Sequence, residues 1–588
     1  MSTMPTTNHT PEGHEEKIAQ RLRESITEHE DGFETPPIDW DEAARFQPSK
    51  LKGNSLTYMV AFVAGTGFTL FGYDQGVMSG MLTLPIFLKQ FPSTATEAGF
   101  GGGNANAATL QSFMVAIYEI GCLVGALSNL WVGDKLGRKH TIALGGFIMT
   151  IGAILQTTAF TYAHMLVARV VTGIGNGLLT STVPAYQSEC AKPHRRGQLV
   201  LWMGSLITFG IMISYWINLG CYFIDNDAAW RFPMAFQIFF AIIMIGCIYG
   251  FRLPDSPRWL VSKGRYAEAV AVLAALDNTT VDDPEIRRTF HGIVDSAQQE
   301  SKEKFSVREL MSHGKTQHFR RTLLGFLAQM FQQISGINLI TYYLTTVLGG
   351  MGLGPVMSRT IAGVNGTVYF LTSIAALFMV ERFGRRPLMV WTALLQAGTF
   401  AILAGLYKEV SDGNKAAQGV SVLMLFLFNT WFSIGWLGMT WLYPAEVTPL
   451  RIRAPANAVS TASNWLFNFM VVMATGPMFA KIGWGTYAFF AAMNGIIIFP
   501  IVYLYFPETK KYSLEELDII FAKAHNERRN PVTVSLEGDI PPAGSREAEQ
   551  ILGRTIRAEK MEDGGLGRRL SRVISGPAEG RRLSREHV

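Results

Sequence analysis

The stretch GDKLGRK, residues 133–139, joins two long apolar runs and carries three basic side chains. A similar stretch, ERFGRR, begins at residue 381 and again separates two apolar runs. Two further pairs follow at nearly the same spacing: PAYQSECAKPHRR at 184 with PAEVTPLRIR at 444, and PDSPRWL at 254 with PETKKYSL at 507. Three motif pairs in the same order predict a chain built from two copies of one structural unit.

Apolar runs of about 20 residues, the length of helix that crosses a bilayer, flank these motifs. Hydrophobic residues make up 48% of the 588 residues and charged residues only 16%, too few to cover a soluble protein of this size. The pattern predicts an all-α membrane protein with twelve transmembrane helices in two six-helix bundles. The predicted spans lie near residues 55–82, 107–131, 141–161, 163–184, 199–221, 231–252, 321–345, 360–380, 387–408, 419–443, 455–478 and 484–506.

The polar segments divide the chain into five parts: a tail at 1–52, a first bundle at 53–252, a helical connector at 253–320, a second bundle at 321–507 and a tail at 508–588. Both tails are polar and are predicted to be largely disordered. The loops that hold the repeated motifs carry eleven Lys and Arg residues, whereas the opposite loops carry six over more residues. Positively charged loops face the cytoplasm, so both termini are expected there.

Other classes of function find little support in the sequence. The net charge of +5 does not indicate nucleic-acid binding, and the four cysteines show no close pairing. No nucleophile–base set, metal-ligand spacing or phosphate-binding loop stands out. We therefore expect neither an enzyme nor a cofactor, and we expect a monomer.

A single acid, Asp74 in FGYDQGVMSG (residues 71–80), lies inside the first predicted span. That span runs outward from the cytoplasm, so Asp74 lies roughly 12 Å below its outer end. Arg169, in LVARVVTG, lies roughly 9 Å below the outer end of the fourth span. Each charge is costly in lipid, and pairing offsets part of that cost, so the two are predicted to face each other. A purely structural ion pair is the alternative to a functional one.

The seventh span carries a cluster of polar side chains in FQQISGINLITYY, residues 331–343. Its two glutamines lie roughly 18 Å deep, near the membrane midplane. Amides both donate and accept hydrogen bonds, so these side chains can bind a polar ligand in a cavity, with hydrogen bonding between helices as the alternative. Gly336 is expected to let the helix unwind locally. The polar side chains are Gln332, Gln333, Asn338, Tyr342 and Tyr343.

Taken in order, the motifs of this chain resemble the sugar porter family of the major facilitator superfamily over roughly residues 55–520. They are GDKLGRK, RVVTGIGNG, PAYQSECAKPHRRG, PDSPRWL, QQISGIN, VERFGRR, YPAEVTPLRIRAPANA and PETKKYSLEEL. The resemblance implies the major facilitator fold, with substrate bound between the two bundles near the midplane. The tenth and eleventh spans resemble fungal members most, a group with hexose and disaccharide carriers and with relatives of the yeast glycerol–proton symporter.

The same resemblance implies a set of substrate-binding residues. Core packing is the alternative for the tryptophans. Gly204 stands where many members have a glutamine, and Ser433 where glucose carriers often have a glutamate. These departures leave the substrate open between a sugar and a polyol. The implied ligands are Gln332, Gln333, Asn338, Tyr342, Asn365, Trp441, Asn464 and Trp465.

The resemblance further implies roles for charged residues. Proton-coupled members keep an acid and an arginine at the positions of Asp74 and Arg169, so Asp74 is the expected proton site. Glu119, in the second span, is expected to be structural or gating. A cytoplasmic gating network is expected to hold the bundles together when the carrier opens outward, with plain topology signals as the alternative. Its members are Asp134, Arg138, Glu189, Arg195, Arg196, Glu381, Arg385, Arg386, Glu446 and Arg451.

The C-terminal tail contains GRRLSR twice, at 567–572 and 580–585. Arg-Arg-x-Ser resembles the substrate pattern of basophilic kinases, so Ser571 and Ser584 are expected phosphorylation sites. A basic tail that touches anionic lipid is the alternative.

The sequence thus predicts a proton-coupled symporter that imports a sugar or polyol across the plasma membrane by alternating access. The alternatives are a sugar uniporter and a transporter-like nutrient sensor. Sensors of this family often have longer cytoplasmic tails than residues 508–588 provide.

Overall fold

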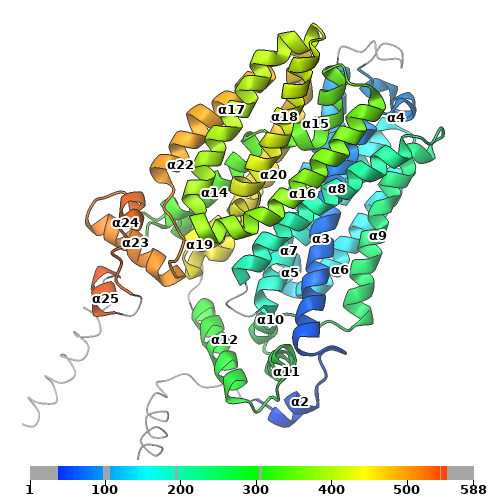
Figure 1. Ribbon diagram of the computed structural model, residues 1–588. Coiled ribbons are helices and arrows are strands. Elements are labelled where there is room, and N and C mark those ends of the chain that lie inside the picture. The colour runs from blue at the N-terminus through cyan, green and yellow to red at the C-terminus, as the bar shows by residue number, and fades with distance from the viewer. Residues whose placement is uncertain (1–37, 97–105, 192–195, 303–306, 543–544, 553–588) are drawn as a thin grey trace, which may run out of the picture.

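The computed structural model describes residues 38–96, 106–191, 196–302, 307–542 and 545–552. Within them, twelve helices are long and apolar enough to cross a membrane, which confirms the predicted all-α membrane protein. Figure 1 shows these helices running side by side. The spans of the first bundle are α3 (Gly53–Met81), α5 (Ala107–Leu136), α6 (Arg138–Thr157), α7 (Tyr162–Cys190), α8 (Arg196–Cys221) and α9 (Ala228–Gly250).

Three spans of the second bundle are interrupted. The seventh span breaks into two helices, and the tenth and twelfth each contain a π-helical segment, a feature often found at functional sites. The spans are α14 (His318–Ile334) with α15 (Ile337–Gly350), α16 (Pro355–Phe383), α17 (Arg385–Ser411), α18 (Lys415–Phe432) with η4 (Ser433–Leu437) and α19 (Met439–Val447), α20 (Arg453–Ile482), and α21 (Trp484–Ala492) with η6 (Met493–Ile498) and α22 (Phe499–Tyr505).

Glycines let the helices of the first bundle approach closely. A Cβ atom at Gly173 of α7 would lie 2.2 Å from the carbonyl oxygen of Tyr118, and one at Gly177 would lie 2.1 Å from that of Cys122. Small residues are typical of such contacts because membrane helices gain little from hydrophobic burial against one another. Gly173 and Gly177 therefore hold α7 against α5 and fix the position of Arg169, which lies one turn before Gly173.

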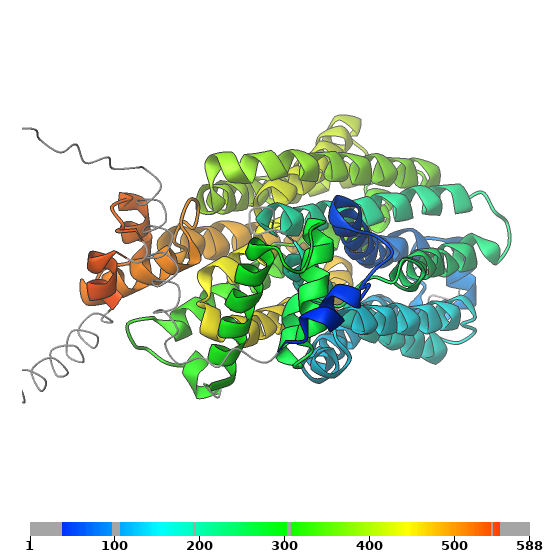
Figure 2. The same cartoon turned by 90° about the horizontal axis from the view of Figure 1, so that it is seen from below.

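The two bundles meet along two helix pairs, α5 with α20 and α8 with α16, and α15 also contacts α3. Seen from below, the blue-to-teal helices and the green-to-orange helices form two adjacent groups (Figure 2). The inner faces of α15 and α20 are therefore turned toward the first bundle, where a substrate site is expected.

The connector folds into helices at one end of the bundles, together with α2 (Trp40–Arg45) (Figure 1). We call this the connector end, and the opposite end, near α4 (Pro85–Gln90), the far end. Most of α11 is buried, which explains the apolar sequence YAEAVAVLAAL. The connector helices are α10 (Pro257–Ser262), α11 (Tyr266–Asp277), α12 (Pro284–Lys302) and α13 (Val307–Leu310).

The C-terminal segment contains three further helices, so the expectation of a largely disordered tail is wrong for this part. The prediction rested on the average composition of the tail and overlooked a local helix-start signal, the capping box of Ser513 and Glu516. The Ser513 hydroxyl accepts the backbone amide of Glu516 at 3.2 Å, and the Glu516 carboxylate accepts that of Ser513 at 2.7 Å. The helices are α23 (Leu514–Asn526), α24 (Pro531–Glu537) and α25 (Arg546–Leu552).

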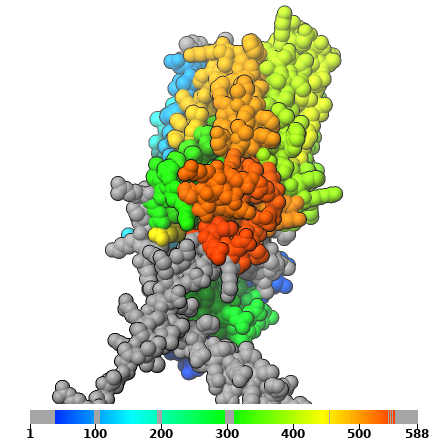
Figure 3. Space-filling model, turned by 90° about the vertical axis from the view of Figure 1, so that its left-hand side faces the viewer, coloured from blue at the N-terminus to red at the C-terminus, as the bar shows by residue number. Residues whose placement is uncertain are grey.

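These helices pack on the second bundle. Figure 3 shows them as an orange-red mass at the lower end of that bundle. Leu517, Ile520 and Val534 form a small apolar core of their own. The guanidinium of Arg321, fully buried at the start of α14, pairs with the carboxylate of Asp518 at 2.6 Å. This ion pair anchors α23 to the seventh span.

Candidate substrate and proton sites

The seventh span breaks at Gly336, as expected from the sequence. Gly336 has φ +97°, and a Cβ atom there would lie 2.9–3.0 Å from the rings of Phe490 and Phe400. Only glycine fits this backbone without strain. The break separates Gln332 and Gln333 of α14 from Asn338 of α15 and lets their amides converge.

The predicted amides form one hydrogen-bonded cluster. Asn338 donates from Nδ2 to Oε1 of Gln333 at 2.5 Å, and Gln333 donates from Nε2 to Oε1 of Gln332 at 3.3 Å. Asn464 of α20 donates to the same Gln332 oxygen at 2.9 Å. The structure therefore brings together four of the predicted ligands.

Two further amides complete this cluster, and the sequence reasoning missed both. Asn468 accepts from Nδ2 of Asn338 at 2.7 Å, and Gln329 accepts from Nδ2 of Asn464 at 2.5 Å. Each lies one helical turn from a predicted residue, Asn464 or Gln333. That spacing on one helix face was the signal that could have found them. We call the six side chains the amide cluster: Gln329, Gln332, Gln333, Asn338, Asn464 and Asn468.

Several donors around the amide cluster have no hydrogen-bond partner among the described residues. They are the ring nitrogens of Trp436 and Trp465 and the amide nitrogen of Asn468. All three side chains are buried. Buried donors are normally satisfied, and unpaired ones cost free energy, so this region is suited to a ligand rich in hydroxyl groups.

The predicted tryptophans contact the first bundle. Trp465 packs edge-on against Phe71 with ring centroids 5.5 Å apart, and Trp441 against Phe68 at 6.4 Å. Both phenylalanines belong to α3. The aromatic rings therefore provide an apolar wall between the bundles next to the amide cluster, which is consistent with either ring stacking or core packing.

Asn365 accepts at Oδ1 a 2.5 Å hydrogen bond from Asn429, another residue that the sequence reasoning did not single out. Of the two departures from the family pattern, Ser433 donates to Thr372 at 2.9 Å and begins the π-helical η4. A Cβ atom at Gly204 would lie 3.4 Å from Leu437. A side chain at position 204 would therefore begin in ordinary van der Waals contact with η4.

Asp74 and Arg169 form a fully buried ion pair. Nη1 of Arg169 lies 3.1 and 3.3 Å from the two carboxylate oxygens of Asp74, and both side chains are 0% exposed. Nη2 donates to the carbonyl oxygen of Val115, and the guanidinium lies 4.5 Å above the ring of Tyr118. The helical-rise estimate from the sequence placed the two charges at similar depths, and the structure pairs them.

Between Gly336 and the far end, α15 is bonded to the first bundle by several side chains. Tyr342 donates to Glu119 of α5 at 2.7 Å, and Tyr343 to Ser112 at 3.0 Å. Tyr215 of α8 donates to the carbonyl oxygen of Thr341 at 2.7 Å. These bonds join the two bundles on the far side of the amide cluster.

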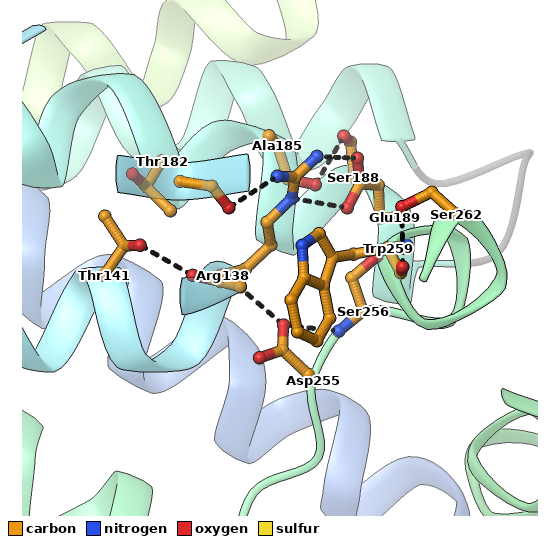
Figure 4. A network of polar contacts seen from close by, with 12 residues as sticks. Arg138, Thr141, Thr182, Ala185, Ser188, Glu189, Asp255, Ser256, Trp259 and Ser262 are labelled. Atoms are coloured by element: carbon orange, nitrogen blue, oxygen red, sulfur yellow. Dashed lines mark hydrogen bonds and ion pairs between the residues drawn. The ribbon is translucent and has the colours of Figure 1, made fainter. Parts of the chain in front are cut away.

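At the connector end, Arg138 is held by two carboxylates (Figure 4). Its guanidinium donates to both oxygens of Glu189 at 3.2 Å, and its backbone amide donates to Asp255 at 2.7 Å. Burial raises the pKa of Asp255, while hydrogen bonds from the backbone amides of Arg138 and Ser256 oppose that shift. Asp255 lies in the quoted motif PDSPRWL but was not singled out from the sequence.

The second bundle repeats this arrangement. Arg385 pairs with Glu446 at 2.8 Å, and its backbone amide donates to Glu508 at 3.0 Å. Tyr186 and Tyr443 also match, donating to the carbonyl oxygens of Pro254 and Pro507, respectively. The structural equivalence supports the internal duplication. Each of these pairs lies within its own half of the protein.

The other residues of the expected gating network have different partners. Asp134 pairs with Lys263 of the connector at 2.9 Å, and Arg451 with Glu309 at 2.6 Å. The backbone amide of Arg386 donates to Glu508 at 3.2 Å. Glu381 also has an interaction. Arg195, Ser571 and Ser584 lie outside the described residues, as does the side chain of Arg196.

Comparison with known proteins identifies close relatives. Residues 60–521 match the family described as Sugar (and other) transporter. The chain is 39% identical over 505 residues to Sugar transporter STL1 of Saccharomyces cerevisiae, covering 85% of this chain and 87% of that protein. It is 38% identical over 511 residues to Major facilitator superfamily transporter mfsA of Aspergillus fumigatus, covering 85% and 92%. Identity to the low-affinity glucose transporter HXT1 of S. cerevisiae is 29%, over 87% and 88% of the two chains.

A solved structure shares the fold. The major facilitator superfamily proton:xylose symporter XylE, bound to 6-bromo-6-deoxy-D-glucose, matches with a TM-score of 0.66 and 25% identity, covering 80% of this chain and 100% of XylE. These relatives are described as transporters, which confirms the expectation of a transporter rather than an enzyme.

Proposed function

This chain belongs to the sugar transporter family of the major facilitator superfamily, and we propose that it imports a sugar or polyol across the plasma membrane together with protons. The observation that carries the proposal of proton coupling is the buried pair of Asp74 and Arg169. Proton coupling requires a group inside the membrane that can bind and release a proton, and a transporter that only equilibrates its substrate does not.

The pair can act as a proton switch for electrostatic reasons. Asp74 is stable as an anion while Arg169 lies 3.1 Å away. If Arg169 moves aside during the transport cycle, the buried carboxylate loses its compensating charge and binds a proton instead. Proton binding and the movement of α7 relative to α3 are then one event. XylE, whose structure is similar, is described as a proton symporter.

For the substrate, we propose the amide cluster as the binding site, with the rings of Trp441 and Trp465 beside it. Unpaired indole and amide donors in a buried region suit a neutral molecule with many hydroxyl groups. Gly204 and Ser433 make this site differ from that of the hexose carriers. Sugars and polyols are both neutral molecules with many hydroxyl groups, so either fits the unpaired donors and a site that differs from that of the hexose carriers.

The far end is the extracellular side in this proposal, and both termini lie in the cytoplasm. The hydrogen bonds of Tyr342 and Tyr343 across the bundles then close the site to the outside. The paired networks at Arg138 and Arg385 lie on the cytoplasmic side and are proposed to stabilise the outward-open state.

Uptake of labelled glucose, fructose, xylose, sucrose and glycerol by a transport-null cell tests the proposal, with and without a protonophore. Accumulation of one substrate that the protonophore abolishes is the expected result. Asp74→Asn is expected to lose accumulation but retain exchange of labelled for unlabelled substrate. Asp227→Asn, an exposed loop residue, serves as the matched control.

The alternatives give different results in the same experiment. A uniporter only equilibrates its substrate, is insensitive to the protonophore, and exchanges substrate equally with or without Asp74. A nutrient sensor shows no uptake of any tested compound, while a signalling response to one of them persists.

A further inference from the structure

Glu119 is a buried carboxyl group that accepts the closing hydrogen bond of Tyr342 in the mechanism above, but whose own protonation that mechanism does not use. It lies on α5, is 0% exposed, and accepts at Oε1 the hydroxyl hydrogen of Tyr342 at 2.7 Å. Its second oxygen, Oε2, has no hydrogen-bond partner in the part of the chain that the structure describes. Because α5 belongs to the first bundle and α15 to the second, the bond from Tyr342 crosses the interface where the far end is closed.

The charges around Glu119 do not balance if both acids are ionised. Asp74 of α3, Arg169 of α7 and Tyr342 of α15 act on this carboxyl group, and Tyr118 and Cys122 flank it on α5. α20, which packs against α5, carries no charged side chain between residues 454 and 480. The guanidinium of Arg169 is the single cation of this set, and it faces two carboxyl groups. A buried net negative charge is costly, so the set is electrically neutral only when it holds one proton.

The geometry indicates which acid holds that proton. Both oxygens of Asp74 lie within 3.3 Å of the Arg169 guanidinium, which favours the ionised form. Glu119 has only a neutral hydroxyl as a donor at one oxygen and nothing at the other. Ionised Glu119 would be a buried anion with one unsolvated oxygen, whereas the neutral acid carries no such penalty.

We propose that Glu119 is a second proton-binding site, and that it must be protonated for Tyr342 to close the extracellular side. This inference rests on the proposed transport function and extends it. When Tyr342 moves away, water reaches the carboxylate, and a proton from the outside forms the O–H bond of the neutral acid. Closure then buries an uncharged group. When the gate reopens, the proton leaves to water and the carboxylate is solvated again.

The proposal predicts how transport depends on external pH. Glu119→Gln is a permanent mimic of the neutral acid, since its amide oxygen can still accept from Tyr342. In the unchanged protein, exchange of labelled substrate should slow at least several-fold as the external pH rises and Glu119 ionises. In Glu119→Gln, exchange should stay nearly constant over the same range. Tyr343→Phe, which removes a neighbouring hydroxyl across the same interface, should keep the original pH dependence.

Thermal unfolding of the purified protein provides a second measurement that needs no substrate. A carboxyl group that stays protonated in the folded state but ionises in the unfolded chain lowers stability as the pH rises. The unfolding temperature of Glu119→Gln should therefore fall less with pH than that of the unchanged protein. A folded Glu119→Gln protein with unaltered pH dependence of both exchange and unfolding overturns the proposal. A different result contradicts the transport function instead. In it, the unchanged protein neither takes up nor exchanges any tested substrate, while its unfolding still depends on pH more strongly than that of Glu119→Gln.

Discussion

The carboxylate of Asp255 accepts the backbone amide of Arg138 at 2.7 Å, although 117 residues separate the two along the chain. In the second half, Glu508 accepts the amide of Arg385 at 3.0 Å. Each acid follows the last span of its bundle and lies at the amino-terminal end of a helix, where free amides and the helix dipole favour a negative charge. The same hydrogen-bonding arrangement therefore occurs twice, with an aspartate in the first half and a glutamate in the second. It links the segment after the last span of each bundle to the loop motif that contains Arg138 or Arg385.

Removal of the Asp255 carboxylate, which caps the amino-terminal end of α6, should destabilise the first bundle. Asp255→Ala leaves the amides of Arg138 and Ser256 without their acceptor and is expected to lower the free energy of unfolding by about 2 kcal/mol. Asp255→Asn keeps an acceptor oxygen and avoids burying a charge, so its loss should be smaller. Unfolding of the purified proteins by heat gives the comparison. Asp227→Ala, at an exposed ion pair, is the control, and an equal effect there would argue against the cap.

The equivalent pairs of Arg138 with Glu189 and of Arg385 with Glu446 should act on the transport cycle. Glu189→Gln keeps the shape of the side chain but removes its charge. It is expected to slow transport about three- to tenfold, since a loss of about 1 kcal/mol from one conformational state shifts the population by that order. Initial rates of uptake at equal surface expression provide the measurement.

Charge reversal supplies the control for this pair. Arg138→Glu and Glu189→Arg should each reduce the rate, and the double variant should recover part of it, because the ion pair is restored with its signs exchanged. The same series at Arg385 and Glu446 should behave alike if the two halves are equivalent. Additive losses in both double variants would show that the side chains act independently.

The sequence predicted the parts of this molecule that depend on periodicity and length. The twelve spans follow from apolar runs, and the juxtaposition of Asp74 with Arg169 follows from the fixed rise of a helix and the alternation of span direction. The break at Gly336 was predictable because glycine readily adopts a positive φ.

What escaped prediction depends on the rotation of helices about their axes and on contacts between distant segments. Asn468 lies one helical turn from the predicted Asn464, but its bond to Asn338 depends on the rotation that turns this face of α20 toward α15. Asn429 meets Asn365 across two helices of the second bundle for the same reason. Asp255 accepts a hydrogen bond from a backbone amide. Every residue except proline has such an amide, so the sequence does not show which residue is its partner.

The ion pair between Arg321 and Asp518 should be essential for the docking of α23. Arg321 is 0% exposed, so Asp518→Asn leaves a buried cation without its counter-charge. Loss of one partner of a buried pair typically costs about 3 kcal/mol or more. The variant should unfold at a lower temperature, and proteolysis within α23 should become faster. Glu515→Gln, on the same helix, is the control. Unchanged proteolysis of α23 in a folded Asp518→Asn protein would show that the apolar contacts alone hold the helix.

Replacement of Gly336 tests whether the break in the seventh span organises the substrate site. The backbone there has φ +97°, and the methyl group of Gly336→Ala would lie 2.9–3.0 Å from Phe490 and Phe400. Strain and crowding together should cost about 2 kcal/mol or more of unfolding free energy. Because Gln333 and Asn338 lie on opposite sides of the break, the apparent affinity for substrate should fall as well.

Gly349→Ala is the matched control for this substitution. Gly349 lies in the same span within α15, and a Cβ atom there would meet nothing within 4 Å. Alanine should be neutral or should stabilise the helix by up to about 1 kcal/mol. Substrate exchange and thermal unfolding of both variants separate the two effects. If Gly336→Ala matched Gly349→Ala in stability and affinity, the break would be a consequence of packing around the span rather than the feature that aligns its amides.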